Sequence, residues 1–148
     1  GLYEETGQNE PGNSNFTWKN SAGDGRYRKS TYTYWKRMLL HPSLASFDAP
    51  ARQVCVARRS RTNTPRQALV TLNDPVFHEC AQAFAQRIMA SDPETGNRLD
   101  FAFQQCLSRL PDRREREQFH HFVAEGGNTA WLSVATVLLN LDETLTRE

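Results

Sequence analysis

Five side chains in one short segment are suited to binding an anion: Arg58, Arg59, Arg61, Asn63 and Arg66. A guanidinium group can form two parallel hydrogen bonds to a phosphate, sulfate or carboxylate, so several in succession create an anion-binding surface. The segment runs into a helix-start signal, and the free N–H groups of a helix N-terminus also favour negative charge. These residues are therefore the candidates for binding an anionic ligand or for forming an interface.

The arginines belong to a strongly basic stretch of the chain. Residues 25–73 hold ten Arg and Lys residues and a single acid, Asp48, which is a local charge of +9. The rest of the chain holds eight basic and sixteen acidic residues, so the net charge of the whole chain is only +1. Because these acids are available to neutralise the arginines, internal ion pairing is the first expectation, and binding of an anionic partner is the alternative.

The three cysteines are the other reactive side chains. Cys55 is a possible reactive thiol, since nearby arginines would stabilise its thiolate if they lay close to it. Free cysteine is among the most buried residue types, however, and we expect Cys55 to be buried and inert. Cys80 and Cys106 fall among apolar helical positions and are predicted to be small buried hydrophobic residues. None forms a C-x-x-C pair, which argues against a zinc ribbon, a redox motif or covalent haem attachment.

No residue pattern in the chain is specific enough to indicate a catalytic site. A metal-binding pair on a helix needs a spacing of three or four residues, and the histidines do not offer one. They are His41, His78, His120 and His121. We therefore expect no metal and no cofactor in this chain, and we favour a domain without enzymatic activity of its own. An enzyme would need a pocket that joins Cys55, His41 or Asp48 to the arginines.

Start and stop signals divide most of the chain into helices. Thr64-Pro65, Asp74-Pro75 and Asp92-Pro93 each place a capping side chain before a proline, which is a pre-organised helix start. Gly126-Gly127 is a stop signal followed by a last helix, and Tyr27 to Leu40 is also predicted to be helical. Residues expected to face the interior are Ala68, Leu69, Leu72, Phe77, Ala81, Phe84, Ile88, Leu99, Phe103, Cys106, Leu107, Phe119, Phe122, Val123, Trp131, Val134, Ala135, Leu138 and Leu139.

Composition places the chain among soluble globular proteins. It has 148 residues, with 38% hydrophobic and 24% charged residues, and no apolar run is long enough to span a bilayer. We predict an all-α, mainly helical fold, a compact bundle of about five helices preceded by an irregular polar N-terminal arm. The expected organisation is a polar arm or linker at 1–25 and a single helical domain at 26–148. Because the first residue is Gly, we expect a fragment of a larger protein.

Several unusual blocks of residues occur in an order that is specific to one family. They are Tyr27-Arg28-Lys29-Ser30, Tyr32 to Arg37, Phe47-Asp48-Ala49-Pro50, Val54-Cys55, Arg58 to Leu69, Leu72-Asn73-Asp74-Pro75 and Leu138 to Glu143. From about Tyr27 to Arg147 the chain resembles the C-terminal domain of unknown function in large planctomycete-type proteins. Those proteins commonly carry a cytochrome-c-like domain and a second domain of unknown function upstream.

The resemblance implies context more than chemistry. It implies a parent protein that is periplasmic or otherwise exported, with any haem in an upstream domain. It also suggests that Asp74 matters, as the arginines do. We expect an interaction module that docks onto other domains of its parent through the basic segment; binding of a sulfated or carboxylated polysaccharide is the alternative. The low net charge and the lack of a recognised motif argue against nucleic acid. The stretch between the Cys106 helix and the final one is shorter than the family pattern.

Overall fold

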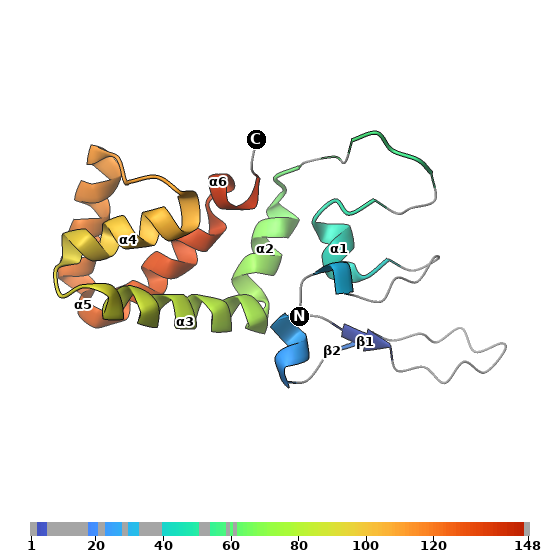
Figure 1. Cartoon of the computed structure of the whole chain (residues 1–148), viewed down its shortest axis with the longest axis horizontal. Helices are drawn as coiled ribbons and strands as arrows, with labels where there is room; N and C mark the ends of the chain where they lie inside the picture. Colours follow the sequence, from blue (N-terminus) through green and yellow to red (C-terminus); the bar gives the residue numbers. More distant parts are fainter. Residues whose placement is uncertain are drawn as a thin grey trace. The chain divides into compact units, whose positions relative to one another are not determined.

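The computed structural model of the chain consists mainly of α-helices (Figure 1). It describes residues 3–5, 18–20, 23–27, 30–32, 40–50, 54–58, 60 and 62–146. The α-helices are α1 (Pro42–Ser46), α2 (Pro65–Asn73), α3 (Pro75–Ser91), α4 (Thr95–Leu107), α5 (Arg113–Asn140) and α6 (Asp142–Leu145). The other elements are the strands β1 (Tyr3–Glu5) and β2 (Trp18–Asn20) and the 3₁₀ helices η1 (Gly23–Tyr27) and η2 (Ser30–Tyr32). The predicted all-α fold is confirmed.

Two compact units divide the chain, residues 1–70 and residues 71–148, and the boundary falls inside α2. The division predicted from the sequence, an arm at 1–25 and one helical domain at 26–148, stays a prediction. In the first unit β1 and β2 pair antiparallel, with Tyr3 opposite Asn20. The arm that was expected to be irregular therefore includes a short two-stranded sheet. Most of the helix predicted for Tyr27 to Leu40 lies outside the described residues, which show only η2 there.

Capping side chains begin α2 and α3 at the predicted prolines. The Asp74 carboxylate accepts a hydrogen bond from the Val76 N–H at 2.8 Å, and Pro75 occupies the first helical position. Thr64 stands in the same way before Pro65 at the start of α2. A proline costs nothing at this position because the N–H that it lacks would have no helical partner. The predictions for both helix starts are confirmed.

Of the next two helices, α4 begins without a side-chain cap, and α5 begins at an acidic cap. The Asp92 carboxylate accepts a hydrogen bond from the Glu94 N–H at 2.8 Å, so the chain makes a turn there and α4 begins later, at Thr95. Asp112 caps α5 in a capping box, in which Asp112 and Glu115 each accept a hydrogen bond from the other's backbone N–H, at 2.7 and 2.8 Å.

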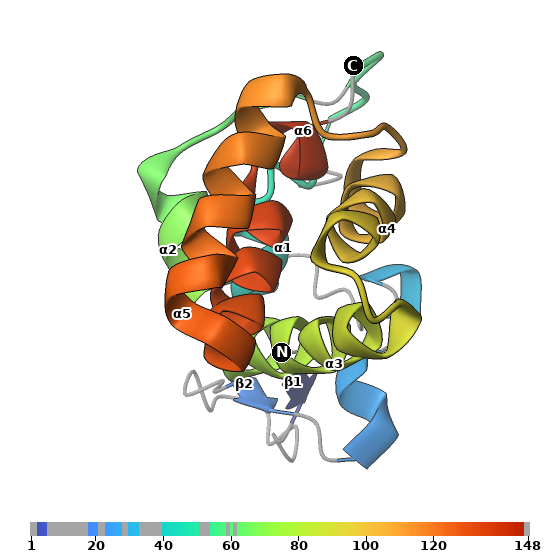
Figure 2. The same ribbon diagram turned by 90° about the vertical axis from the view of Figure 1, so that its left-hand side faces the viewer.

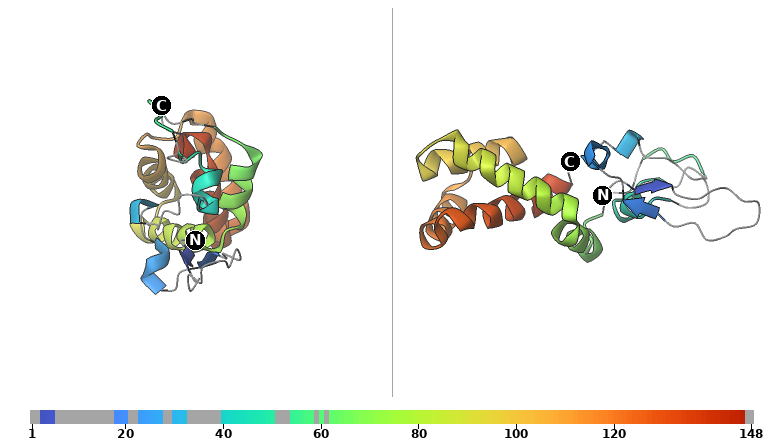
Figure 3. Two further views of the ribbon diagram at one scale, coloured as in Figure 1. Left: turned by 90° about the vertical axis from the view of Figure 1, so that its right-hand side faces the viewer. Right: turned by 90° about the horizontal axis from the view of Figure 1, so that it is seen from below.

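The core of the second unit forms where α3, α4 and α5 pack against one another (Figure 2). In the right-hand view of Figure 3, α3 runs alongside the C-terminal half of α5, drawn in red. The largest fully buried side chains are Trp131, Phe103, Ile88, Leu99, Leu138 and Val134. The Phe103 and Phe119 rings meet edge to face, with their centroids 5.5 Å apart. These residues were all predicted to face the interior.

A glycine pair breaks α5 into two arms. Gly127 has φ +57° and ψ −143°, a combination that residues with a side chain rarely adopt. At Gly126 an added Cβ would lie 2.9 Å from the Ala130 Cβ, so the turn also needs a residue without a side chain there. The predicted stop is confirmed, and the second arm places Trp131 and Val134 in the core.

Three expectations about burial in the second unit are wrong, and the first is Leu72, which is 54% exposed. Cys80 is exposed, because it is one residue, or about 100° of helix rotation, before the buried Ala81 and lies at the edge of the α3 stripe. Phe122 is also exposed, and its neighbour Val123 faces the core instead. Cys106, in contrast, packs against the core from a partly buried position, where burial raises the pKa of its thiol.

Candidate functional site

Asp48, the one acid of the basic stretch, organises the loop that leads into α2. It follows α1 with φ +56°, a left-handed conformation that Asp tolerates better than most residues. Its Oδ2 accepts hydrogen bonds from the Thr62 N–H at 2.8 Å and from the Thr62 hydroxyl at 2.7 Å. The same oxygen accepts a third hydrogen bond from the Gln67 amide at 3.3 Å. The carboxylate therefore connects the end of α1 to the start of α2.

Gln67 completes this network from inside α2. Its side-chain oxygen accepts a hydrogen bond from the Thr64 N–H at 2.9 Å, and its own N–H donates to the Thr64 hydroxyl at 3.4 Å, which is the reciprocal pattern of a capping box. The Gln67 amide also donates to the Thr62 hydroxyl at 3.2 Å. Gln67 is buried, and its amide is hydrogen-bonded, as a buried polar group requires.

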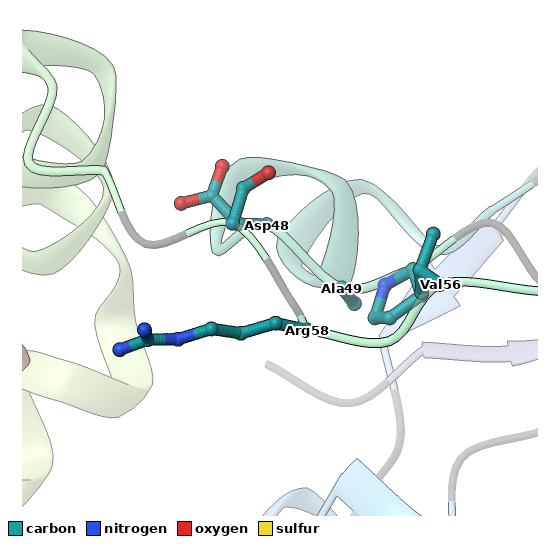
Figure 4. Close-up of a pocket in the computed structure, with 6 residues that line it drawn as sticks. Asp48, Ala49, Val56 and Arg58 are labelled. Carbon is teal, nitrogen blue, oxygen red and sulfur yellow. The ribbon is translucent and has the colours of Figure 1, made fainter.

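An open depression of about 230 Å³ lies beside this network (Figure 4). Its lining residues are Asp48, Ala49, Pro50, Val56, Arg58 and Ser60. Asp48 and Arg58 reach it from two separate segments and extend to the same side, while Ala49 and Val56 lie together at the other end. The depression thus combines a charged end with an apolar end.

The described arginines of the basic segment face solvent. Arg58 and Arg66 are exposed, and neither forms an ion pair with any residue that the structure describes. Asn63 is exposed as well. Arg59 and Arg61 lie outside the described residues. For Arg58 and Arg66, the internal pairing expected from the sequence is therefore wrong within this part of the chain.

In the second unit, acids pair with basic residues of the same unit. Arg109 pairs with Glu115 at 2.7 Å and with Glu143 at 2.9 Å, and so fastens the start of α5 to α6. Its hydrogen bonds to Glu115 lower the pKa of that carboxyl from 4.5 to about 2. Arg116 pairs with Asp100 at 2.5 Å. These carboxylates are satisfied locally, which explains why they do not neutralise Arg58 or Arg66.

Exposed apolar side chains accompany the arginines. Val54 is 74% exposed and Val56 is 52% exposed, next to the exposed Cys55. Exposing a valine leaves about 1.5–3 kcal/mol of burial free energy unused for each side chain. Sequence reasoning missed both valines as interface candidates, although they form a short apolar run with Cys55 and Ala57 directly before Arg58, outside any helical pattern, which is a signal that could have identified them.

Of the three residues that the enzyme hypothesis would join to the arginines, Asp48 lies with Arg58 in the depression, whereas Cys55 and His41 do not line it. His41 is buried and caps α1, where its Nδ1 accepts a hydrogen bond from the Ser43 N–H at 3.2 Å. Burial lowers the pKa of His41. The prediction that Cys55 is buried is wrong: it sits in a loop without a helical stripe to carry it inward.

Neither a metal-binding cluster nor a membrane-spanning helix occurs among the described residues. Among them, no group of three or more His, Cys, Asp or Glu side chains could hold a metal ion. None of the helices in the described part of the chain is both long and apolar enough to cross a membrane.

Comparison with protein families gives one match. The family PSD1, described as "Protein of unknown function (DUF1553)", matches residues 3–123 of the 148. The chain belongs to this family. The match covers both the basic segment and the depression, so the candidate site is part of the PSD1 domain. No curated protein and no solved structure matches the chain. The resemblance inferred from the sequence is confirmed as far as a family of unknown function.

Proposed function

We propose that this PSD1 domain is an interaction module that docks an acidic polypeptide segment of a neighbouring domain of its parent protein. One observation carries this function: Val54 and Val56 are exposed beside Arg58, which lacks an ion pair to any described residue. An interface combines apolar contact with charge complementarity, and this segment presents both. A parent that is exported, planctomycete-type and associated with cytochrome-c-like domains belongs to the proposal and comes from the sequence resemblance.

The apolar side chains favour a protein partner over a polysaccharide. A sulfated polysaccharide would use the guanidinium groups but would leave Val54 and Val56 in water. In an extended peptide, residues two positions apart lie on the same side, so an acidic residue and an apolar residue at i and i+2 could contact the charged end and the apolar end of the depression. Because the Asp48 carboxylate is already held by Thr62 and Gln67, the exposed cations Arg58 and Arg66 favour an acidic peptide.

Docking within one parent chain does not require tight binding. Exposed ion pairs contribute about 0–1 kcal/mol each, so the isolated domain should bind a free peptide weakly. Linkage within a parent protein supplies an effective concentration on the order of millimolar, which compensates for weak contacts. Because exposed charges are screened by salt, the affinity should fall as ionic strength rises.

The test uses a labelled peptide of Glu-Ser-Val-Ser repeats (the Glu-Val peptide), in which Glu and Val share one side of an extended chain, with heparin as the polysaccharide probe. We expect Arg58→Glu with Arg66→Glu to weaken peptide binding about tenfold or more, measured by fluorescence anisotropy at low salt. Arg87→Glu with Arg114→Glu is the matched control, since it changes the net charge equally at exposed positions of the second unit. Equal losses in the two variants would mean non-specific attraction. Tight heparin binding without peptide binding would favour the polysaccharide alternative.

A further inference from the structure

The depression beside Asp48 is small enough to select the part of a polypeptide that enters it. Its volume of about 230 Å³ lies below the roughly 300–1,000 Å³ of sites that enclose a small-molecule ligand. An internal segment of a polypeptide can lie across such a depression, but both of its ends must leave again. A chain end, in contrast, can enter the depression with its last residue.

The charged end of the depression offers one cation to a carboxylate. Among the described lining residues, Arg58 is the one cation and Asp48 is the one acid. The Asp48 Oδ2 atom already accepts three hydrogen bonds, whereas Arg58 is exposed and forms no ion pair with a described residue. A guanidinium group binds one carboxylate through two parallel hydrogen bonds. Because the negative charge of Asp48 repels a doubly charged phosphate more strongly, a single carboxylate is the better match.

The apolar end of the depression suits a small aliphatic side chain. Its lining residues are Ala49, Pro50 and Val56, whose side chains carry no polar atom. Figure 4 shows Ala49 and Val56 together, away from the Arg58 guanidinium. Because Val56 is about half exposed, an aliphatic side chain that covers it removes apolar surface of both partners from water.

We infer, building on the proposed docking function, that the segment bound here is a polypeptide C-terminus whose last residue is small and aliphatic. The terminal carboxylate binds Arg58, and the last side chain lies against Pro50 and Val56. Both groups are attached to the same Cα, so they fit into the space of one residue. In an internal segment, an acidic residue and its apolar neighbour on the same side are roughly 7 Å apart. Capture of a terminal carboxylate is one of the recurring modes of peptide recognition.

Two labelled peptides of equal net charge test this inference. One is Ser-Gly-Ser-Gly-Val with a free C-terminal carboxylate, and the other is Ser-Gly-Glu-Gly-Val with a C-terminal amide, so each carries one carboxylate at a different position. The unchanged protein should bind the free-acid peptide about tenfold more tightly, measured by fluorescence anisotropy at low salt. Equal affinities would overturn the inference that the terminal carboxylate is bound.

The Glu-Val peptide, prepared with an amidated end, separates this inference from the proposed function. It has acidic and apolar side chains but no terminal carboxylate. If it binds while the two short peptides bind equally, the docking of acidic segments stands and the chain-end inference falls. If none of the three peptides binds, both fall.

Two substitutions locate the binding, each with a matched control in the same unit. Arg58→Gln should remove the preference for the free-acid peptide, whereas Arg66→Gln should retain it, because Arg66 is also exposed but does not line the depression. Val56→Ser should weaken binding of the free-acid peptide about threefold or more. Val54→Ser is its control, since Val54 is exposed outside the depression. A preference that survives Arg58→Gln, or that Arg66→Gln removes, would overturn the inference.

Discussion

Helices α2 and α3 follow one another directly, and both begin at a proline behind a capping side chain, yet they bury opposite kinds of residue. Helix α3 buries Ala81, Ala85 and Ile88, as its apolar spacing predicts. Helix α2 buries Gln67 and Thr71 and exposes its leucines. The same type of helix start therefore leads to two different uses of a helix. One helix builds a core, and the other offers its apolar face to solvent.

The second unit and the basic segment also differ in whether their charged side chains form ion pairs. In the second unit, Arg109 and Arg116 pair with acids of that unit. Around the basic segment, the acid Asp48 is bonded by hydroxyl, amide and backbone donors, while Arg58 and Arg66 remain exposed. The second unit thus pairs several of its charges internally and buries a core of apolar side chains. The basic segment leaves both kinds of group available, as expected for a surface that acts with a partner.

The largest effect on the free energy of unfolding is expected when a buried leucine of the second unit is truncated and compared with an exposed one. Leu99 is fully buried, so Leu99→Ala should lower the free energy of unfolding by about 2–5 kcal/mol. Leu72 is exposed, and Leu72→Ala should change it by no more than about 0.5 kcal/mol. Urea unfolding followed by circular dichroism measures both. A comparable loss in the two variants would erase the contrast between the buried core and the exposed Leu72.

A smaller, local effect should follow removal of the Asp48 carboxylate. Asp48→Ala removes the acceptor of the exposed Thr62 N–H and one of the acceptors of the Gln67 amide, at a cost of about 0.5–1.5 kcal/mol in local stability. Hydrogen exchange at the Thr62 amide should accelerate accordingly. Asp48→Asn is the matched control, since it keeps one acceptor oxygen and tolerates a positive φ. Unchanged exchange in Asp48→Ala would mean that the network does not hold the loop.

The smallest effect concerns pH in the second unit. The pKa of Glu115 is lowered to about 2 by its hydrogen bonds to Arg109. A depressed pKa stabilises the folded state fully above the ordinary value of 4.5, and that contribution is lost as the pH falls toward 2. Because the pair is partly exposed, the contribution is on the order of 1 kcal/mol.

Unfolding curves at several pH values test this linkage. Glu115→Gln should be less stable than the unchanged protein at neutral pH, and its stability should fall less steeply between pH 4.5 and 2. Glu117→Gln is the control, because Glu117 pairs with Arg113 on the exposed side of the same helix. The same pH slope in Glu115→Gln and in the unchanged protein would contradict the role of Arg109.

Local signals explain the parts of the fold that could be predicted. The starts at Pro65 and Pro75 and the break at Gly127 depend on φ preferences and on side chains within three residues. The interior positions of α3 and α4 also followed from spacing, since residues such as Ile88 and Phe103 recur on one helical face. The candidate site could be predicted only as a basic segment with an acid, Asp48, in its sequence neighbourhood.

Tertiary contacts decided the rest. By itself, the sequence determined the all-α class, the capped helix starts, the glycine break and the charge asymmetry, because each depends on a few neighbouring residues or on composition. It could not determine that α2 would bury Gln67 and expose Leu69. The Gln67 amide finds its partners at Asp48, nineteen residues earlier in the chain, and Thr71 finds Asn140, sixty-nine residues later. The rotation of a helix depends on such distant partners, and so does the face that it leaves to solvent.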